Sequence, residues 1–114
     1  MTRSVKDMET QDTWTLGGHT LHSRFILGSG KFSIDLIEAV LEEAGAEMIT
    51  LALRRAVGGE VENILDAIPK DTILIPNTSG ARDAEEAVRI ARLSRATGCG
   101  DFVKVEIMKD SKYL

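Results

Sequence analysis

The chain has 114 residues, with 14 Lys and Arg against 18 Asp and Glu, so its formal net charge is −4 and one small domain is expected. With 43% hydrophobic and 28% charged residues, the composition is typical of a chain that folds around a core and not of a disordered one. The mildly acidic balance has no run of like charges and offers no long-range attraction to a nucleic acid or an anionic membrane, so we expect neither partner.

The N-terminal residues 1–12 show no hydrophobic periodicity, and we expect them to be a disordered segment that precedes one domain over residues 13–114. The segment is polar and unlike a signal peptide, and no apolar stretch approaches the ~20 residues of a membrane-spanning helix, so we expect a cytoplasmic protein. The domain opens with two short alternating runs, Thr13–Leu16 and His19–His22, around Gly17-Gly18. This pattern predicts a β-hairpin, because glycine adopts the positive φ angles of a tight turn without steric cost.

Beyond the hairpin, short apolar runs alternate with helical patterns. One helix has Ser33 as its expected N-cap and Gly45 as its stop, and another has Asp83 and Glu86 at the spacing of a capping box. The expected strands are Phe25–Leu27, Met48–Leu53, Thr72–Pro76 and Phe102–Ile107, and the expected helices are Ser33–Ala44, Val61–Ile68 and Asp83–Thr97. The inner face expected for the last helix is Ala84, Ala87, Val88 and Ala91.

This alternation predicts parallel strands joined by right-handed crossovers, hence an α/β architecture. Two folds compete, the open doubly wound sheet and the (β/α)8 barrel. The doubly wound fold is expected to carry G-x-G-x-x-G after its first strand, but Gly28-Ser29-Gly30 is followed by Ser33 in the place of the third glycine. A barrel needs ~250 residues, so four βα repeats correspond to about half of one.

The expected strand Phe102–Ile107 carries two charged side chains on one face. Its period of two places Lys104 and Glu106 together, opposite an apolar face that belongs under the helices, and in a barrel the charged pair would face the interior. A partly desolvated lysine can supply a neutral amine that forms an imine with a ketone or aldehyde. Glu106, ~6.6 Å further along the strand, is near enough to move protons on that adduct. The alternative, which the pattern alone favours, is an edge strand with both side chains in water.

Two other positions are candidates for substrate binding. Arg54 falls at the C-terminal end of the strand Met48–Leu53, where a barrel enzyme binds its substrate, and could hold an anion, although a surface arginine is the simpler interpretation. Asn77 begins the small polar segment Asn77–Gly80, which suits a substrate-lining loop or a turn into the next helix.

The histidines and the cysteine do not suggest a metal or a disulfide. His19 and His22 have no further ligand nearby, and the single Cys99 has no partner for an intrachain bridge. We therefore expect no metal site and no cofactor.

Several segments resemble the bacterial thiazole synthases of thiamine biosynthesis. Ser23–Phe32 resembles the opening strand and loop of that family, and Pro76–Arg92 is similar to its third βα unit. Other segments that match in order and spacing are Gly45–Glu47, Leu53–Arg55 and Phe102–Glu106. The resemblance runs from about Leu16 to Leu114.

The resemblance implies a (β/α)8 barrel enzyme, a transferase that condenses 1-deoxy-D-xylulose 5-phosphate, dehydroglycine and sulfur into the thiazole phosphate of thiamine. The sulfur arrives as the C-terminal thiocarboxylate of a small sulfur-carrier protein. The imine-forming lysine of the family matches Lys104, and its proton-transferring glutamate matches Glu106.

The family continues through four further βα units, which carry its phosphate-binding loops and a second acidic residue. We therefore expect the hairpin and about the first four βα units of the barrel, inactive when alone and associating with itself as a homo-oligomer to cover open strand edges. The alternatives are another Schiff-base-forming barrel enzyme of the aldolase type and a non-catalytic half-barrel that only binds a partner.

Overall fold

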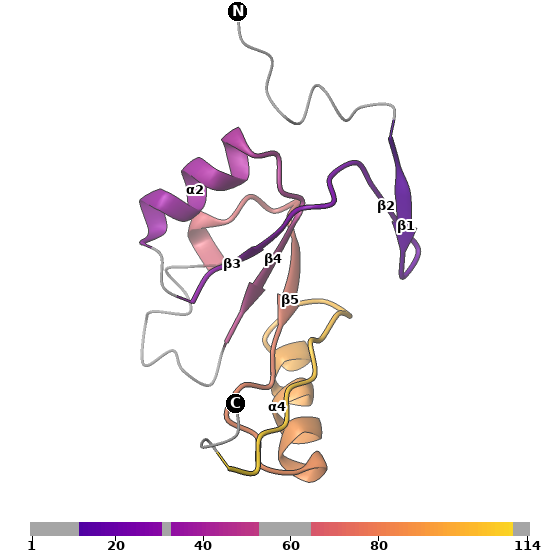
Figure 1. Ribbon diagram of the computed structural model, residues 1–114, viewed down its shortest axis with the longest axis vertical. Helices are drawn as coiled ribbons and strands as arrows, with labels where there is room; N and C mark the ends of the chain where they lie inside the picture. The colour runs from indigo at the N-terminus through magenta and orange to yellow at the C-terminus, as the bar shows by residue number, and fades with distance from the viewer. Residues whose placement is uncertain (1–11, 31–32, 53–64, 111–114) are drawn as a thin grey trace, which may run out of the picture.

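The computed structural model describes residues 12–30, 33–52 and 65–110. Within these ranges a two-stranded antiparallel hairpin precedes a three-stranded parallel sheet with the strand order β3-β4-β5 (Figure 1). The strands are β1 (Trp14–Leu16), β2 (His19–Leu21), β3 (Ile26–Gly28), β4 (Met48–Leu51) and β5 (Ile73–Pro76), and the helices are α2 (Ile34–Glu43) and α4 (Ala84–Ala96). The predicted α/β class and parallel sheet are confirmed, and the arrangement is compatible with part of a barrel.

The hairpin forms where the sequence predicts it. Trp14 pairs with Leu21, and the turn between the strands places Gly17 at φ 55° and Gly18 at φ 82°. Two successive residues with positive φ are what a two-residue hairpin turn requires, and glycine adopts them without strain.

Both described helices begin at the predicted N-caps. The Ser33 hydroxyl accepts a hydrogen bond from the Leu36 N–H at 3.2 Å, and the Asp83 carboxylate accepts one from the Glu86 N–H at 2.8 Å. The Glu86 side chain in turn accepts the Arg82 N–H at 2.7 Å. Each cap satisfies a backbone donor that the first helical turn leaves without a partner.

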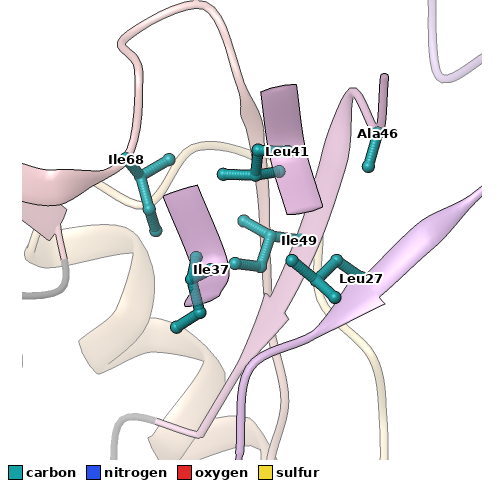
Figure 2. Close-up of a cluster of buried hydrophobic side chains, with 6 residues drawn as sticks. All are labelled: Leu27, Ile37, Leu41, Ala46, Ile49 and Ile68. Carbon is teal, nitrogen blue, oxygen red and sulfur yellow. The ribbon is translucent and has the colours of Figure 1, made fainter. Parts of the chain in front are cut away.

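One face of the sheet packs against α2. Figure 2 shows Ile37 and Leu41 of the helix against Leu27 of β3 and Ile49 of β4. Ile49 is fully buried, and burial of a side chain of this size contributes about 1.5–3 kcal/mol to stability. Ala46 and Ile68 complete this cluster, which is the larger core of the described chain.

The other face of the sheet is covered by the hairpin near the beginnings of the strands. Leu21 of β2 packs with Met48 and Ile75, and Trp14 and Phe102 lie against them. In Figure 1 the hairpin and α2 accordingly lie on opposite sides of the sheet.

The prediction of a fourth strand over Phe102–Ile107 is wrong, because this segment does not pair with β5 along its length. The structure has only an isolated parallel bridge between Asn77 and Lys104, and the face expected beneath helices is open, with Val105 65% exposed. The ladder stops because the Thr78 carbonyl turns away to accept the Ala81 N–H at 3.0 Å, in the turn that precedes α4. That carbonyl would otherwise have made the next rung.

The predicted inner face of α4 is partly wrong. The helix buries Ala87, Ile90 and Ser94, whereas Ala84 is exposed and Val88 is 48% exposed. A polar residue can lie on the inner face because the Ser94 hydroxyl donates to the Ile90 carbonyl at 2.9 Å and so keeps a hydrogen bond when buried.

Some predictions fall outside the described residues. They include residues 1–11 of the expected disordered segment, the end of the strand Met48–Leu53 beyond residue 52, and most of the helix Val61–Ile68, of which residues 65–67 are described and helical. Asp12 is described, and its carboxylate pairs with Arg24 at 2.8 Å. None of the helices in the described ranges is long and apolar enough to cross a membrane.

Candidate functional site

The predicted site residues gather where β5 ends and the segment 102–108 runs beside it. Asn77 lies directly opposite Lys104 in the parallel bridge, and directly opposed residues point to the same face of a sheet. Because side chains alternate along β5, this face is the one that also carries Ile75, opposite α2. Lys104 therefore lies on the predicted face of the sheet.

Lys104 and Glu106 form an ion pair. The Nζ of Lys104 lies 3.2 Å from the Oε1 of Glu106, and the two side chains are 56% and 38% exposed. The partial desolvation expected for the lysine is therefore not provided by the described residues. The arrangement nevertheless sets an amine beside a carboxylate that can exchange protons with it or with a bound molecule.

The backbone of Lys104 is fixed from both sides. Its N–H donates to the Pro76 carbonyl at 2.9 Å, and its carbonyl accepts the Thr78 N–H at 3.2 Å. These two bonds are the only rungs of a main-chain ladder between β5 and the segment 102–108 among the described residues, and both belong to the lysine.

Glu106 is held by a side chain that sequence reasoning missed. The Thr78 hydroxyl accepts the Glu106 N–H at 2.8 Å and donates to the Glu106 carbonyl at 2.7 Å, and Thr78 is fully buried. Further along the segment, the Met108 N–H donates to the Ala81 carbonyl at 2.9 Å. No periodic pattern signals a contact across 28 residues, so only the structure reveals it.

Asn77 is brought to the pair, and Arg54 is not described. The side-chain oxygen of Asn77 accepts the Ser79 N–H at 3.1 Å, so the residue shapes the turn that its sequence suggested. Arg54 lies outside the described residues. The structure thus brings together Lys104, Glu106 and Asn77.

A hollow of about 350 Å³ adjoins Glu106, and Ser79, Arg82 and Lys109 contribute to its lining. Its size is within the range of small-molecule sites, and it places two cations near the candidate pair. Within the described ranges, no group of three or more His, Cys, Asp or Glu side chains is arranged to hold a metal ion.

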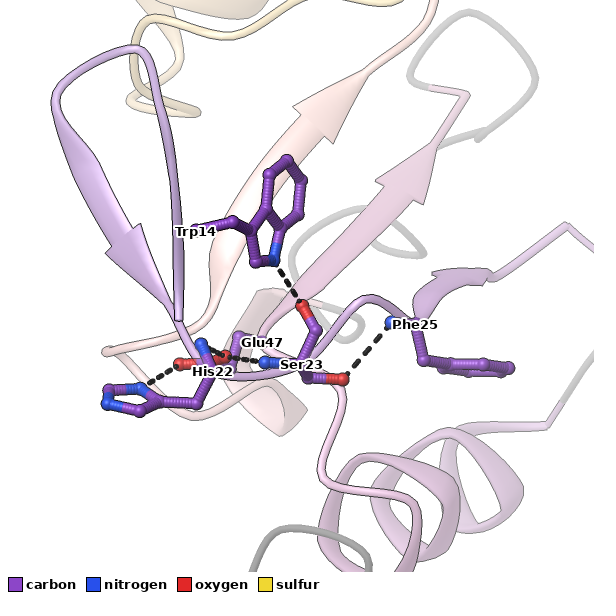
Figure 3. Close-up of polar contacts among 5 residues, drawn as sticks. All are labelled: Trp14, His22, Ser23, Phe25 and Glu47. Atoms are coloured by element: carbon purple, nitrogen blue, oxygen red, sulfur yellow. Dashed lines mark hydrogen bonds and ion pairs between the residues drawn. The ribbon is translucent and has the colours of Figure 1, made fainter. Parts of the chain in front are cut away.

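A second polar cluster joins the hairpin to the sheet at the opposite end (Figure 3). The Glu47 carboxylate accepts the N–H groups of His22 and Ser23 at 2.5 and 2.6 Å, and the Trp14 indole donates to the Ser23 carbonyl at 2.9 Å. Burial raises the pKa of Glu47, but the hydrogen bonds from Ser23 and His22 outweigh it and hold the pKa below its ordinary value. This cluster anchors the hairpin and was also missed from the sequence.

Comparisons with known proteins point in one direction. The family model described as "Thiazole biosynthesis protein ThiG" matches residues 15–114. A curated protein named thiazole synthase from Clostridium beijerinckii is 69% identical to this chain, and the match covers 91% of this chain and 41% of the relative. Another of that name, from Campylobacter jejuni, is 61% identical, and the match covers 90% of this chain and 40% of the relative. One from Fusobacterium nucleatum is 60% identical over 91% and 40%. The chain spans about 40% of the length of these relatives.

Proposed function

Because the chain belongs to the family of the thiazole biosynthesis protein ThiG, we propose that its complete gene product is a thiazole synthase of thiamine biosynthesis. The reaction would combine 1-deoxy-D-xylulose 5-phosphate, dehydroglycine and sulfur into a thiazole phosphate. The observation that supports this most directly is the Lys104–Glu106 pair at 3.2 Å on the sheet face opposite α2.

We assign Lys104 as the residue that forms the imine. Its neutral amine would attack the ketone carbon of the sugar phosphate, and the carbonyl oxygen would leave as water after proton transfers. Glu106 would take a proton from the carbon next to the imine and return it where the new bonds form, because its carboxylate lies beside the amine. Both roles fit residues whose side chains reach the same point.

We assign Asn77 and Arg54 to substrate binding. The Asn77 side-chain oxygen is committed to the Ser79 N–H, so its NH2 group is the part that would donate to a substrate oxygen. Arg54 would bind an anionic group of the substrate, and this role is a proposal from its sequence position alone.

Trapping the imine tests the proposal. The complete gene product is incubated with 1-deoxy-D-xylulose 5-phosphate and borohydride, and the reduced adduct is mapped by mass spectrometry. We expect one adduct at Lys104, lost in Lys104→Ala and retained in Lys70→Ala, which removes an exposed lysine before β5. An adduct at Lys109 with Lys104 unmodified would contradict the assignment.

We also propose that the sulfur donor of the complete protein is a sulfur-carrier thiocarboxylate. For residues 1–114 alone, we propose that they form no thiazole phosphate and that this segment associates with itself. Self-association is supported by exposed apolar side chains along the segment beside β5, among them Val105 at 65% and Ile107 at 47%. Sedimentation of the purified segment checks it, and a compact monomer that unfolds cooperatively would refute it. The cytoplasmic location stays a prediction from the sequence.

A further inference from the structure

The segment that carries Lys104 and Glu106 is attached to the turn after β5 in two different ways. Lys104 is bound by main-chain groups alone, through Pro76 and the Thr78 N–H. Glu106 is bound through the Thr78 hydroxyl, which contacts both its N–H and its carbonyl. One side-chain oxygen therefore takes the place of a rung of the ladder.

A hydroxyl is suited to this place because it can donate one hydrogen bond and accept others at the same oxygen. The Thr78 carbonyl cannot make the missing rung, since it accepts the Ala81 N–H in the turn. Thr78 is fully buried, so water cannot replace its hydroxyl without a rearrangement of the turn.

The geometry points to Thr78 as a positioning residue for Glu106, and this inference rests on the proposed function. Thr78 fixes the backbone from which the Glu106 carboxylate reaches Lys104 Nζ at 3.2 Å. The Thr78 hydroxyl bonds to the main chain of Glu106 and to neither side chain of the ion pair, so the role inferred for it is positioning.

The two modes of attachment lead to unequal effects on the two chemical steps. Loss of the Thr78 hydroxyl leaves both main-chain bonds of Lys104 in place, so attack of the amine on the ketone should persist. It frees Glu106, and a misplacement of about 1 Å can lower a catalytic rate on the order of 100-fold. Proton transfer should therefore suffer far more than imine formation.

A structural measurement without substrate tests whether the Thr78 hydroxyl holds the backbone of Glu106. Amide hydrogen exchange is followed by NMR in the complete gene product for Thr78→Val, which keeps the shape, and Thr78→Ser, which keeps the hydroxyl. We expect exchange at the Glu106 N–H to speed up on the order of 10-fold or more in Thr78→Val, with the Lys104 N–H unchanged and Thr78→Ser close to wild type. Equal protection of the Glu106 N–H from exchange in wild type and Thr78→Val would overturn the inference.

A kinetic measurement tests positioning. In Thr78→Val we expect turnover to fall on the order of 10- to 100-fold while borohydride trapping at Lys104 falls less than about threefold, and we expect Thr78→Ser to recover most of the turnover. The control is Thr97→Val, which removes a hydroxyl bond to the Ser94 carbonyl at the far end of α4 and should leave both readouts unchanged.

The outcomes separate this inference from the proposed function. If Thr78→Val loses turnover and borohydride trapping equally, Thr78 only supports folding, and the inference is overturned. If turnover is the same in Thr78→Val and wild type, Glu106 does not need the Thr78 hydroxyl to be positioned, and the inference is overturned as well. If wild-type protein gives no adduct at Lys104, the proposed function fails and takes the positioning role with it. If Thr78→Val does not fold, Thr78→Ser decides, because a turnover well below wild type in a folded Ser variant contradicts a role carried by the hydroxyl.

Discussion

The two ends of one sheet face differ sharply although the same strands build both. Where the hairpin covers this face, Met48 at the start of β4 and Ile75 within β5 are buried beneath Leu21. At the strand ends, only two residues beyond Ile75 on the same face, Asn77 meets Lys104, whose side chain is 56% exposed. On this face β4 carries Met48 before Thr50, and β5 carries Ile75 ahead of Asn77, so apolar contacts precede polar groups and the part that stabilises the sheet is separate from the part proposed to meet a substrate.

The same separation is seen in how charges are held at the two ends. At the hairpin end, the Glu47 carboxylate accepts two backbone N–H groups, so its hydrogen bonds serve the fold. At the open end, the backbone of Glu106 is hydrogen-bonded to the Thr78 hydroxyl, and its carboxylate forms an ion pair with Lys104. Substitutions at the two ends should therefore change different measurements.

The largest effect is expected at the open end. Lys104→Ala should lower turnover by about 10³-fold or more, since the proposed covalent nucleophile is lost, and should change the free energy of unfolding by less than about 0.5 kcal/mol, because its side chain is exposed. Steady-state kinetics and urea unfolding of the complete gene product measure the two. A large loss of stability would mean that the open end also supports the fold.

The counterpart at the closed end is Met48→Ala. Met48 is 1% exposed beneath the hairpin, so its truncation should lower the free energy of unfolding by about 2–5 kcal/mol. In the fraction that remains folded, turnover should stay within about twofold of wild type. Urea unfolding and kinetics at low temperature give both values, and a turnover that falls with stability intact would contradict the separation of the two ends.

Glu106→Gln sharpens the comparison within the open end. Loss of the carboxylate should lower turnover about 10²-fold, a typical contribution of a general acid or base, while borohydride trapping at Lys104 falls less. If both fall equally, Glu106 acts mainly on the protonation of the lysine amine and not on the later proton transfers.

The smallest effect is expected for Glu47→Gln, about 1–2 kcal/mol of stability at neutral pH, because the amide oxygen accepts the same N–H groups more weakly. The folded protein holds the Glu47 pKa below its usual 4.5, so the charged form favours folding above that pH, and the contribution is lost as the pH falls through the lowered value. The stability difference between wild type and variant should therefore be constant above about pH 6 and shrink in acid. Urea unfolding across pH 3–7 measures it, and a difference that grows in acid would contradict the sign.

The elements could be predicted from the sequence where local rules decide. The turn at Gly17-Gly18 and the cap at Ser33 leave clear patterns, and so does the side-chain alternation that places Lys104 on its face of the sheet. What could not be predicted depends on side chains that bond to distant backbone. The Thr78 hydroxyl reaches across 28 residues to hold the Glu106 backbone, and the Glu47 carboxylate reaches back across 24 to the Ser23 N–H.

The hairpin turn also touches the far end of the described chain. A Cβ on Gly17 would lie 3.0 Å from the Phe102 ring, and the His19 ring packs against the same phenylalanine in a tilted arrangement, with 5.4 Å between the ring centroids. During synthesis at ~5–20 residues per second, the ribosome would add Phe102 roughly 4–17 s after Gly17. Among the described elements the hairpin is the first to be made, and until Phe102 is added the nascent chain presents Leu21, Met48 and Ile75 without the aromatic ring that later helps to cover them.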